Sequence, residues 1–366
     1  MKTSTSLLEP RPGILEITPY KGGKSKLNGH DKVIRLASNE SALGPSPKAI
    51  MAFEEHKDEL KRYPDGDAID LRHALAKLHG LDPNNIVCGA GSDELLQLLA
   101  RAYAGPGDEV VYSRHGFLVY ELAARSVGAR PVSAPEKEFT ADVDSLLSKV
   151  TNKTRIVFLA NPNNPTGSYI PREELFRLWR GLPQNVLLVL DAAYAEFVLP
   201  EDYDPGIELV RSTNNVIMTR TFSKIYGLAS LRLGWCYGSE KVIDIINRLR
   251  GPFNVTGSAL AAGLEAIKDQ DHISSALRHN TKWMTRLTKE CDAMGIEVLP
   301  SVCNFALIRL GQNTSKDSKA LDGYLCSKGI ITRNVDNYHL PNCLRISVGL
   351  DYEMKTLLLE LKKFMA

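Results

Sequence analysis

Short apolar runs that alternate with helical segments between residues 86 and 221 constrain the fold of this chain more than any other feature. The runs IVCGA, DEVVYS, TRIVFLAN, NVLLVLDAAY and NNVIMTRT each contain a continuous apolar stretch, and segments with helical character, such as GSDELLQLLARAYA and PREELFRLWRGL, separate them. Strands of this kind are buried on both faces, as in a mostly parallel sheet covered by helices. The sequence therefore predicts an α/β domain.

The regions on either side of this alternation differ from it. Residues 1–45 are rich in Pro, Gly and polar residues and predict an N-terminal arm rather than a packed element. After Gly251 a long helical region, roughly 256–293, precedes several short strands, a helix and a closing amphipathic helix. We predict an arm at 1–45, a large α/β domain at 46–255, and a small α+β domain at 256–366 that includes part of the N-terminal segment.

Charge and composition exclude several classes of partner. The 366 residues include 45 basic and 43 acidic side chains, a net charge of +2, so no global field favours nucleic acid or an anionic membrane. The six cysteines and eight histidines show no metal-binding spacing. No signal peptide or apolar run of ~20 residues is recognisable. We expect a cytoplasmic protein without metal, nucleic-acid or membrane binding.

The first two strand ends carry groups suited to an anion and to a hydrogen-bonding ligand. In open α/β sheets, ligands bind at the carboxyl ends of the strands. Gly91, Ser92 and Asp93 follow IVCGA and open a helix, whose N-terminus can hold a phosphate, although Ser and Asp are also ordinary N-caps. Residues 161–167, NPNNPTG, follow TRIVFLA and offer three Asn amides in a rigid turn.

The next two strand ends carry an acid and an amine. Asp191 follows five apolar residues, and a carboxylate buried there requires a cationic partner. Lys224 lies in TRTFSKIYGLASLRLGW, a segment without the alternating charges of a surface helix. An anion cradle, an amide, a carboxylate with the phenol of Tyr194, and a lysine are the groups that pyridoxal phosphate requires.

Motifs over nearly the whole chain resemble one enzyme family. GAGSDEL, NPNNPTG, DAAYAEF, RTFSKIYGLASLRLG, RYPDG and LPNCLRISVG match the order and spacing of the fold-type I, pyridoxal-phosphate-dependent aminotransferases of class I/II. ASNESALGPSP and the RN…LPNCLRISVG ending resemble the histidinol-phosphate aminotransferase group within them. The resemblance implies a large domain with a mostly parallel seven-stranded sheet between helices, a smaller α+β C-terminal domain and an N-terminal arm.

The resemblance also implies roles for cofactor residues. It makes Lys224 the Schiff-base lysine and proton shuttle, and Asp191 the partner of the pyridinium nitrogen. Tyr194 and Asn164 would bond the ring oxygen. Tyr63 would reach the cofactor phosphate of the neighbouring subunit, which implies a homodimer. The other implied cofactor contacts, to the phosphate and the ring face, are Gly91, Ser92, Asp93, Thr221, Ser223, Arg232 and Phe117.

Substrate binding is implied for arginines and for the N-terminal arm. Arg345 resembles the arginine that binds substrate carboxylates, and Arg333 resembles a second one characteristic of the histidinol-phosphate group. Tyr20 resembles a tyrosine of the N-terminal arm, which in this family forms a lid segment that closes over the substrate, and Asn39 matches a position beside the same pocket. A guanidinium can bind carboxylate and phosphate alike in bidentate fashion. The implied reaction converts L-histidinol phosphate and 2-oxoglutarate to imidazole-acetol phosphate and L-glutamate, a step of histidine biosynthesis.

Other functions stay open at this point. Aromatic amino-acid aminotransferases and threonine-phosphate-type decarboxylases of the same fold use the same lysine and aspartate, so Tyr20, Arg333 and Arg345 are the discriminating positions. A binding or regulatory protein that retains the fold without catalysis is the third possibility, but no helix-turn-helix segment or basic patch precedes the domain. Taken singly, Lys224 and Arg345 also fit solvated side chains.

Overall fold

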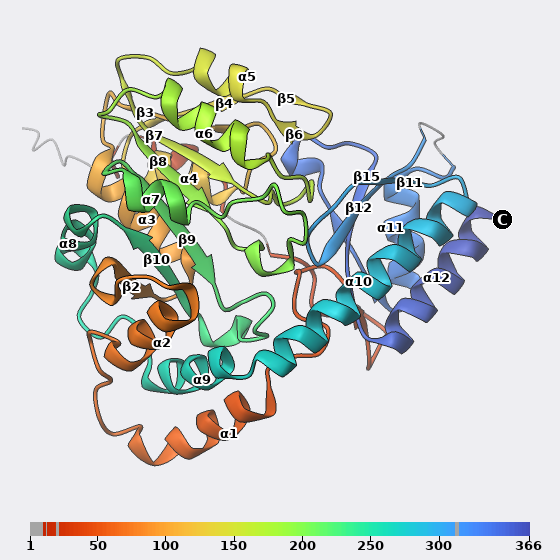
Figure 1. The fold of residues 1–366 in the computed structure, drawn as a ribbon. Helices are drawn as coiled ribbons and strands as arrows, with labels where there is room; N and C mark the ends of the chain where they lie inside the picture. The colour runs from red at the N-terminus through yellow and green to blue at the C-terminus, as the bar shows by residue number, and fades with distance from the viewer. Residues whose placement is uncertain (1–9, 12, 20–21, 312–314) are drawn as a thin grey trace, which may run out of the picture.

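The computed structural model describes residues 10–11, 13–19, 22–311 and 315–366, and a seven-stranded sheet forms its larger part (Figure 1). Six strands run parallel, and β10 is antiparallel to both of its neighbours, β2 and β9. In spatial order the strands are β2 (Ile86–Gly89), β10 (Gly234–Gly238), β9 (Val216–Thr221), β8 (Leu187–Asp191), β7 (Thr154–Ala160), β3 (Glu109–Ser113) and β4 (Arg130–Ala134).

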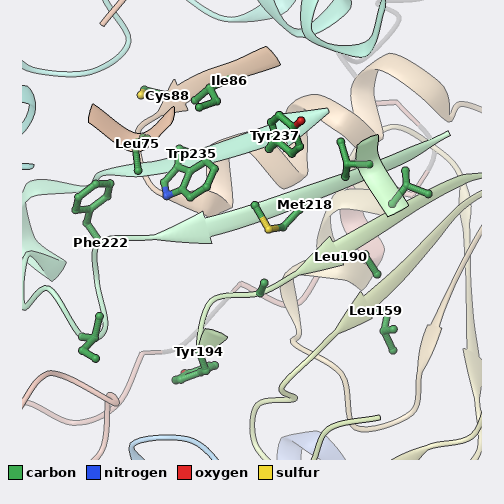
Figure 2. Packing of buried hydrophobic residues seen from close by; sticks show 14 of the residues in the cluster. Leu75, Ile86, Cys88, Leu159, Leu190, Tyr194, Met218, Phe222, Trp235 and Tyr237 are labelled. Carbon is green, nitrogen blue, oxygen red and sulfur yellow. The ribbon is translucent and has the colours of Figure 1, made fainter. Parts of the chain in front are cut away.

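Helices cover both faces of this sheet, because successive residues of each apolar strand point to opposite sides. Leu188 and Leu190 belong to one core cluster, and Leu187 and Val189 belong to the other. Figure 2 shows part of the first cluster, in which Leu159, Leu190, Met218 and Trp235 come from four different strands. The helices packed in the first cluster are α1 (Pro47–Glu55), α2 (Ile69–His79), α5 (Val143–Ser148), α6 (Arg172–Gly181), α7 (Ile207–Ser212), α9 (Gly257–Lys268) and the first turns of α10 (Gln270–Ala293).

The second cluster and the α/β arrangement agree with the predicted fold class. Its helices are α3 (Ser92–Tyr103), α4 (Val119–Ser126) and α8 (Glu240–Leu249). The mostly parallel seven-stranded sheet between helices is confirmed. The proposed boundaries of the three domains stay predictions.

A smaller, antiparallel sheet lies beside the large one (Figure 1). Its strands are, in spatial order, β11 (Glu297–Leu299), β12 (Phe305–Arg309), β15 (Cys343–Ser347) and β14 (Arg333–Asn334). Helices α10 (Gln270–Ala293), α11 (Ser318–Ser327) and α12 (Asp351–Met365) contribute to its core. The N-terminal segment joins this part of the molecule, because β1 (Ile34–Arg35) pairs with β13 (Ile330–Ile331). The two remaining strands of the described chain, β5 (Glu136–Lys137) and β6 (Thr140–Ala141), have two residues each and pair as an antiparallel hairpin.

The helical region predicted at 256–293 is interrupted. Asp269 leaves the helical conformation, with φ −91° and ψ 67°, and separates α9 from α10. Helix α9 then packs against α1, whereas α10 runs on to the small sheet at β11 (Figure 1). Helix α1 ends at Glu55, and a 3-10 turn over His56–Glu59 follows it. Within the part of the chain that the structure describes, no helix combines the length and the apolar character needed to cross a membrane.

Candidate functional site

The carboxyl ends of β7, β8 and β9 border a cavity of about 340 Å³. Parallel pairing sets their ends level, because Ala160 is the partner of Asp191 and Asp191 is the partner of Thr219. The opposite wall comes from the small sheet, through Arg333 and Arg345, and from the N-terminal segment at residues 22–23 and 37–40. Both parts of the molecule are therefore needed to form the cavity.

One end of the cavity is a cradle for an anion. Helix α3 begins at Ser92, directly after Gly91, whose φ of +83° is accessible to glycine at little cost. Arg232 crosses this helix start: its Nη1 donates to Ser223 Oγ at 3.2 Å, and its Nη2 lies 3.3 Å from Asp93 Oδ2. A Cβ at Gly91 would collide with the Arg232 guanidinium. Free backbone N–H groups, a hydroxyl and a guanidinium thus meet where a helix N-terminus favours negative charge.

The acid at the end of β8 is held away from water. Asp191 is 5% exposed, and each of its carboxylate oxygens has a donor. The Tyr120 hydroxyl donates to Oδ2 at 2.8 Å, and the Thr219 hydroxyl lies 3.4 Å from Oδ1. Burial raises the pKa of Asp191 to about 6, and the bond from Tyr120 opposes that rise. Such a carboxylate is stabilised by a cation brought into the cavity.

The lysine after β9 points into the same cavity. Lys224 Nζ donates to the Ser38 carbonyl at 3.3 Å and lies 5.6 Å from the centre of the Tyr194 ring. Burial, and then the positive charge of Arg345, lower the pKa of Lys224 to about 8. Near neutral pH, a much larger fraction of this amine than of a solvated lysine is therefore neutral and nucleophilic.

Two arginines enter the cavity from the small sheet. Arg333 of β14 and Arg345 of β15 are cross-strand partners, so their side chains lie on the same face of that sheet. The Arg345 guanidinium donates to the Asn164 side-chain oxygen and, at 2.6 Å, to the Ala37 carbonyl. The arginine is 5% exposed and is thereby fixed beside the NPNNPTG turn.

Asn39 connects the N-terminal segment to both parts of the site. Its Nδ2 donates to the Tyr194 hydroxyl at 2.7 Å, and its backbone N–H donates to Ser347 Oγ at 2.8 Å. Its φ of +56° is a conformation that Asn adopts more readily than most residues. The Asn304 amide donates to its carbonyl at 3.0 Å. These bonds hold Tyr194 with its hydroxyl beside the arm.

Most of the residues predicted from the sequence meet here, although their roles stay predictions. Gly91 lies in the cradle, and the residues that line the cavity are Asn39, Ser92, Asp93, Phe117, Asn164, Asp191, Tyr194, Thr221, Ser223, Lys224, Arg232, Arg333 and Arg345. Tyr63 does not lie in this cavity. It is 83% exposed, and its ring stacks on that of Phe253 with centroids 4.7 Å apart. Tyr20 lies outside the described residues.

The sequence interpretation missed three contributors. Tyr120 lies three residues after Phe117, a spacing that places both near one face at the start of a helix. Thr219 precedes Thr221 by two strand positions, so both point to the cavity side. The Ser38 carbonyl has no sequence signal, because its contact with Lys224 depends on how the arm folds back. Among the described residues, no group of three or more His, Cys, Asp or Glu side chains is arranged to hold a metal ion.

Comparisons with known proteins point to one family. Residues 31–360 match the family model described as aminotransferase class I and II. The chain is 54% identical to a histidinol-phosphate aminotransferase of Paramagnetospirillum magneticum, over 97% of this chain and 98% of that one. It is 52% identical to a histidinol-phosphate aminotransferase of Rhodospirillum rubrum, over 100% of this chain and 99% of that one. The crystal structure of histidinol-phosphate aminotransferase from Sinorhizobium meliloti, in complex with pyridoxal-5'-phosphate, superimposes with a TM-score of 0.86 at 32% identity and 91% coverage of both chains.

The lowered pKa of Lys224 predicts how its amine reacts. Trinitrobenzenesulfonate attacks only neutral amines, so we expect the labelling of Lys224 in the ligand-free protein to rise through a midpoint near pH 8. The amine of a solvated lysine reaches its labelling midpoint at a pH of about 10.4. Peptide mapping by mass spectrometry over a pH series measures both kinds of lysine in one sample. A midpoint for Lys224 equal to that of the solvated lysines would contradict the electrostatic description of the site.

Proposed function

The chain belongs to the class I and II aminotransferases, and from that membership we propose that it is a histidinol-phosphate aminotransferase that uses pyridoxal phosphate. It exchanges the amino group between L-histidinol phosphate and 2-oxoglutarate, giving imidazole-acetol phosphate and L-glutamate. The observation that carries the proposal is the meeting of a low-pKa lysine, a buried carboxylate and two arginines in one cavity.

The residues of the cavity fit this cofactor. The start of α3, Ser223 and Arg232 hold its phosphate, and the absence of a side chain at Gly91 keeps that cradle open. Phe117 packs on the face of its ring. Tyr194 and the amide nitrogen of Asn164 donate to its ring oxygen. When bound, pyridoxal phosphate supplies an aldehyde that bonds to amines and a ring that accepts the electrons left behind by a departing proton.

Two side chains carry the proton chemistry. Lys224 is the amine that would hold the cofactor aldehyde, and once a substrate amine had taken its place, its neutral Nζ would move a proton between the substrate carbon and the cofactor carbon. A lowered pKa suits this role, because a protonated ammonium cannot accept a proton. Asp191 holds a proton at the ring nitrogen and so keeps the ring positively charged.

The arginine pair serves both substrates. L-Histidinol phosphate has a phosphate and no carboxylate, whereas glutamate has two carboxylates and no phosphate. A guanidinium binds either anion through parallel N–H···O bonds. Because Arg333 and Arg345 lie opposite each other on β14 and β15, they accept these groups in turn at one place.

The substrate is tested with single half-reactions. Holoenzyme is mixed separately with L-histidinol phosphate, L-glutamate, L-phenylalanine and L-threonine phosphate, and the cofactor absorbance is recorded. We expect L-histidinol phosphate and L-glutamate to convert the cofactor to its amine form, and L-histidinol phosphate to do so at the lowest concentration. Preferred conversion by phenylalanine would assign an aromatic aminotransferase, and release of CO₂ from threonine phosphate would assign a decarboxylase; either result overturns the proposal.

The active unit is proposed to be a homodimer with a shared site. Large apolar side chains are exposed on one side of the molecule around α1, the turn after it and the segment before α9: Ile50, Met51, Phe53, Leu60, Tyr63 and Phe253. A second cavity of about 340 Å³, lined by Arg62 and Tyr63, lies in the same region. Exposed apolar patches of this kind mark association surfaces. Tyr63 of each protomer reaches the cofactor phosphate of its partner.

A hybrid dimer tests the shared site. Protomers with Lys224→Ala and protomers with Tyr63→Ala are co-expressed with different tags, and the heterodimer is purified by both tags. One of its two sites then has an intact lysine and an intact tyrosine from the other chain, so we expect about half of the wild-type activity at limiting cofactor. The Tyr63→Ala homodimer is the control and should be much less active. If Tyr63 acts within its own subunit, the hybrid dimer will have no more than half of the activity of the Tyr63→Ala homodimer.

We propose a cellular location from the absence of disulfide bonds among the described cysteines. All six cysteines are free, and five of them are buried. Free buried thiols are usual in the reducing cytoplasm, where we propose that this enzyme acts.

A further inference from the structure

A tyrosine outside the predicted site, Tyr120 of α4, bonds directly to the buried acid at the end of β8. With the proposed function as the premise, we propose that Tyr120 is a positioning residue for Asp191. Its hydroxyl orients the Asp191 carboxylate toward the cofactor ring nitrogen and keeps that carboxylate ionised. The bond from Tyr120 to Asp191 Oδ2 measures 2.8 Å and spans α4 and β8, which are distant in sequence.

Aromatic packing fixes the position of this hydroxyl. The Tyr120 ring is 1% exposed and stacks on Phe158 of β7, with centroids 4.8 Å apart and planes within 6°. Phe117, which lines the cavity, meets it edge-on at 6.0 Å. The ring has no room to turn away, so the hydroxyl stays on one carboxylate oxygen. The same packing links the aromatic wall of the cavity to the orientation of the acid.

The direction of the bond follows from the two acidities. Burial, and then the charge of Asp191, raise the pKa of Tyr120 well above its usual value, so the phenol stays protonated and can donate. A donor to a carboxylate favours its ionised form. Burial pushes the pKa of Asp191 the other way, to about 6, and the bond from Tyr120 is the largest effect that opposes it.

The other groups that act on Asp191 do not replace this donor. Asp93 of α3 is negative and raises the pKa of the carboxyl. Tyr194, on the segment after β8, is a phenol whose hydroxyl accepts a bond from Asn39. Thr219 of β9 is not titratable and lies 3.4 Å from the other oxygen, and the backbone N–H of Ala193 adds one further bond. Among the described residues, Tyr120 therefore makes the shortest side-chain hydrogen bond to Asp191.

The substitution Tyr120→Phe removes one oxygen and leaves the stacking on Phe158. We expect kcat for histidinol phosphate to fall by about 10- to 100-fold, the usual effect of losing a hydrogen bond to a charged group, while KM changes little because the arginines are untouched. Tyr112→Phe is the matched control: Tyr112 belongs to the same aromatic cluster, 6.4 Å from Tyr120, but its hydroxyl lies 3.4 Å from Glu121 instead. The control should keep wild-type kcat.

A second readout does not depend on turnover. The affinity of the ligand-free protein for pyridoxal phosphate should fall as the pH drops through about 6, because Asp191 becomes neutral. Removal of the donor raises the pKa of Asp191 further, so in Tyr120→Phe this loss should occur at a pH higher by about one unit. Tyr112→Phe should follow the wild-type curve. An unchanged curve in Tyr120→Phe would show that the tyrosine only packs, and would overturn the inference.

A double-substitution cycle separates action through Asp191 from a general loss of structure. In an Asp191→Asn background, Tyr120→Phe should have little further effect on cofactor affinity, because the charge that it serves is gone. Two independent and additive losses would overturn the inference, as would a folding defect shared with Tyr112→Phe. If the wild-type protein itself fails to take up pyridoxal phosphate at Lys224, the proposed function fails instead, so the two failures are distinguishable.

Discussion

The burial of one carboxylate at the end of β8 is the constraint on which the site depends. Asp191 is enclosed by the sheet, and its partners in the ladder are Ala160 of β7 and Thr219 of β9. A charge in that position costs free energy unless donors or a cation compensate it. Tyr120 and Thr219 supply part of this compensation, and in the proposed function the ring nitrogen of the cofactor supplies the remainder. The parallel register then sets the distance from this acid to Lys224.

The second constraint is that the cavity has walls from separate parts of the fold. The sheet ends contribute the acid, the amide turn and the lysine, whereas Arg333 and Arg345 come from the small sheet. Asn39 and the Arg345 contacts with Asn164 and Ala37 join the three segments directly. In the proposed function, substrate anions are therefore bound by one part of the molecule while the proton chemistry takes place on another. A change in the relative position of the two parts would alter substrate binding before it altered cofactor binding.

The sequence alone predicted much of this arrangement, and the exceptions have physical causes. The continuous apolar runs determined the sheet, and the position of Asp191 at the end of one run and of Lys224 three residues after another was enough to bring both to one edge. Tyr120 was missed because its role depends on which atom its hydroxyl reaches, which is a matter of tertiary register. The interruption at Asp269 was missed because helical patterns stand on both sides of it and no Pro or Gly marks the break. Tyr63 faces away from the cavity of its own chain, so its proposed role requires a second copy.

The most direct test of the central claim is the protonation state of the cofactor ring. Holoenzyme is prepared with pyridoxal phosphate carrying ¹⁵N in the ring, and the chemical shift of that nitrogen is recorded from mildly acidic to mildly alkaline pH. The account predicts a protonated nitrogen over the whole range in the wild-type enzyme and a deprotonated one in Asp191→Asn. A nitrogen that loses its proton in the wild-type enzyme at the pH where the free cofactor does so would contradict it.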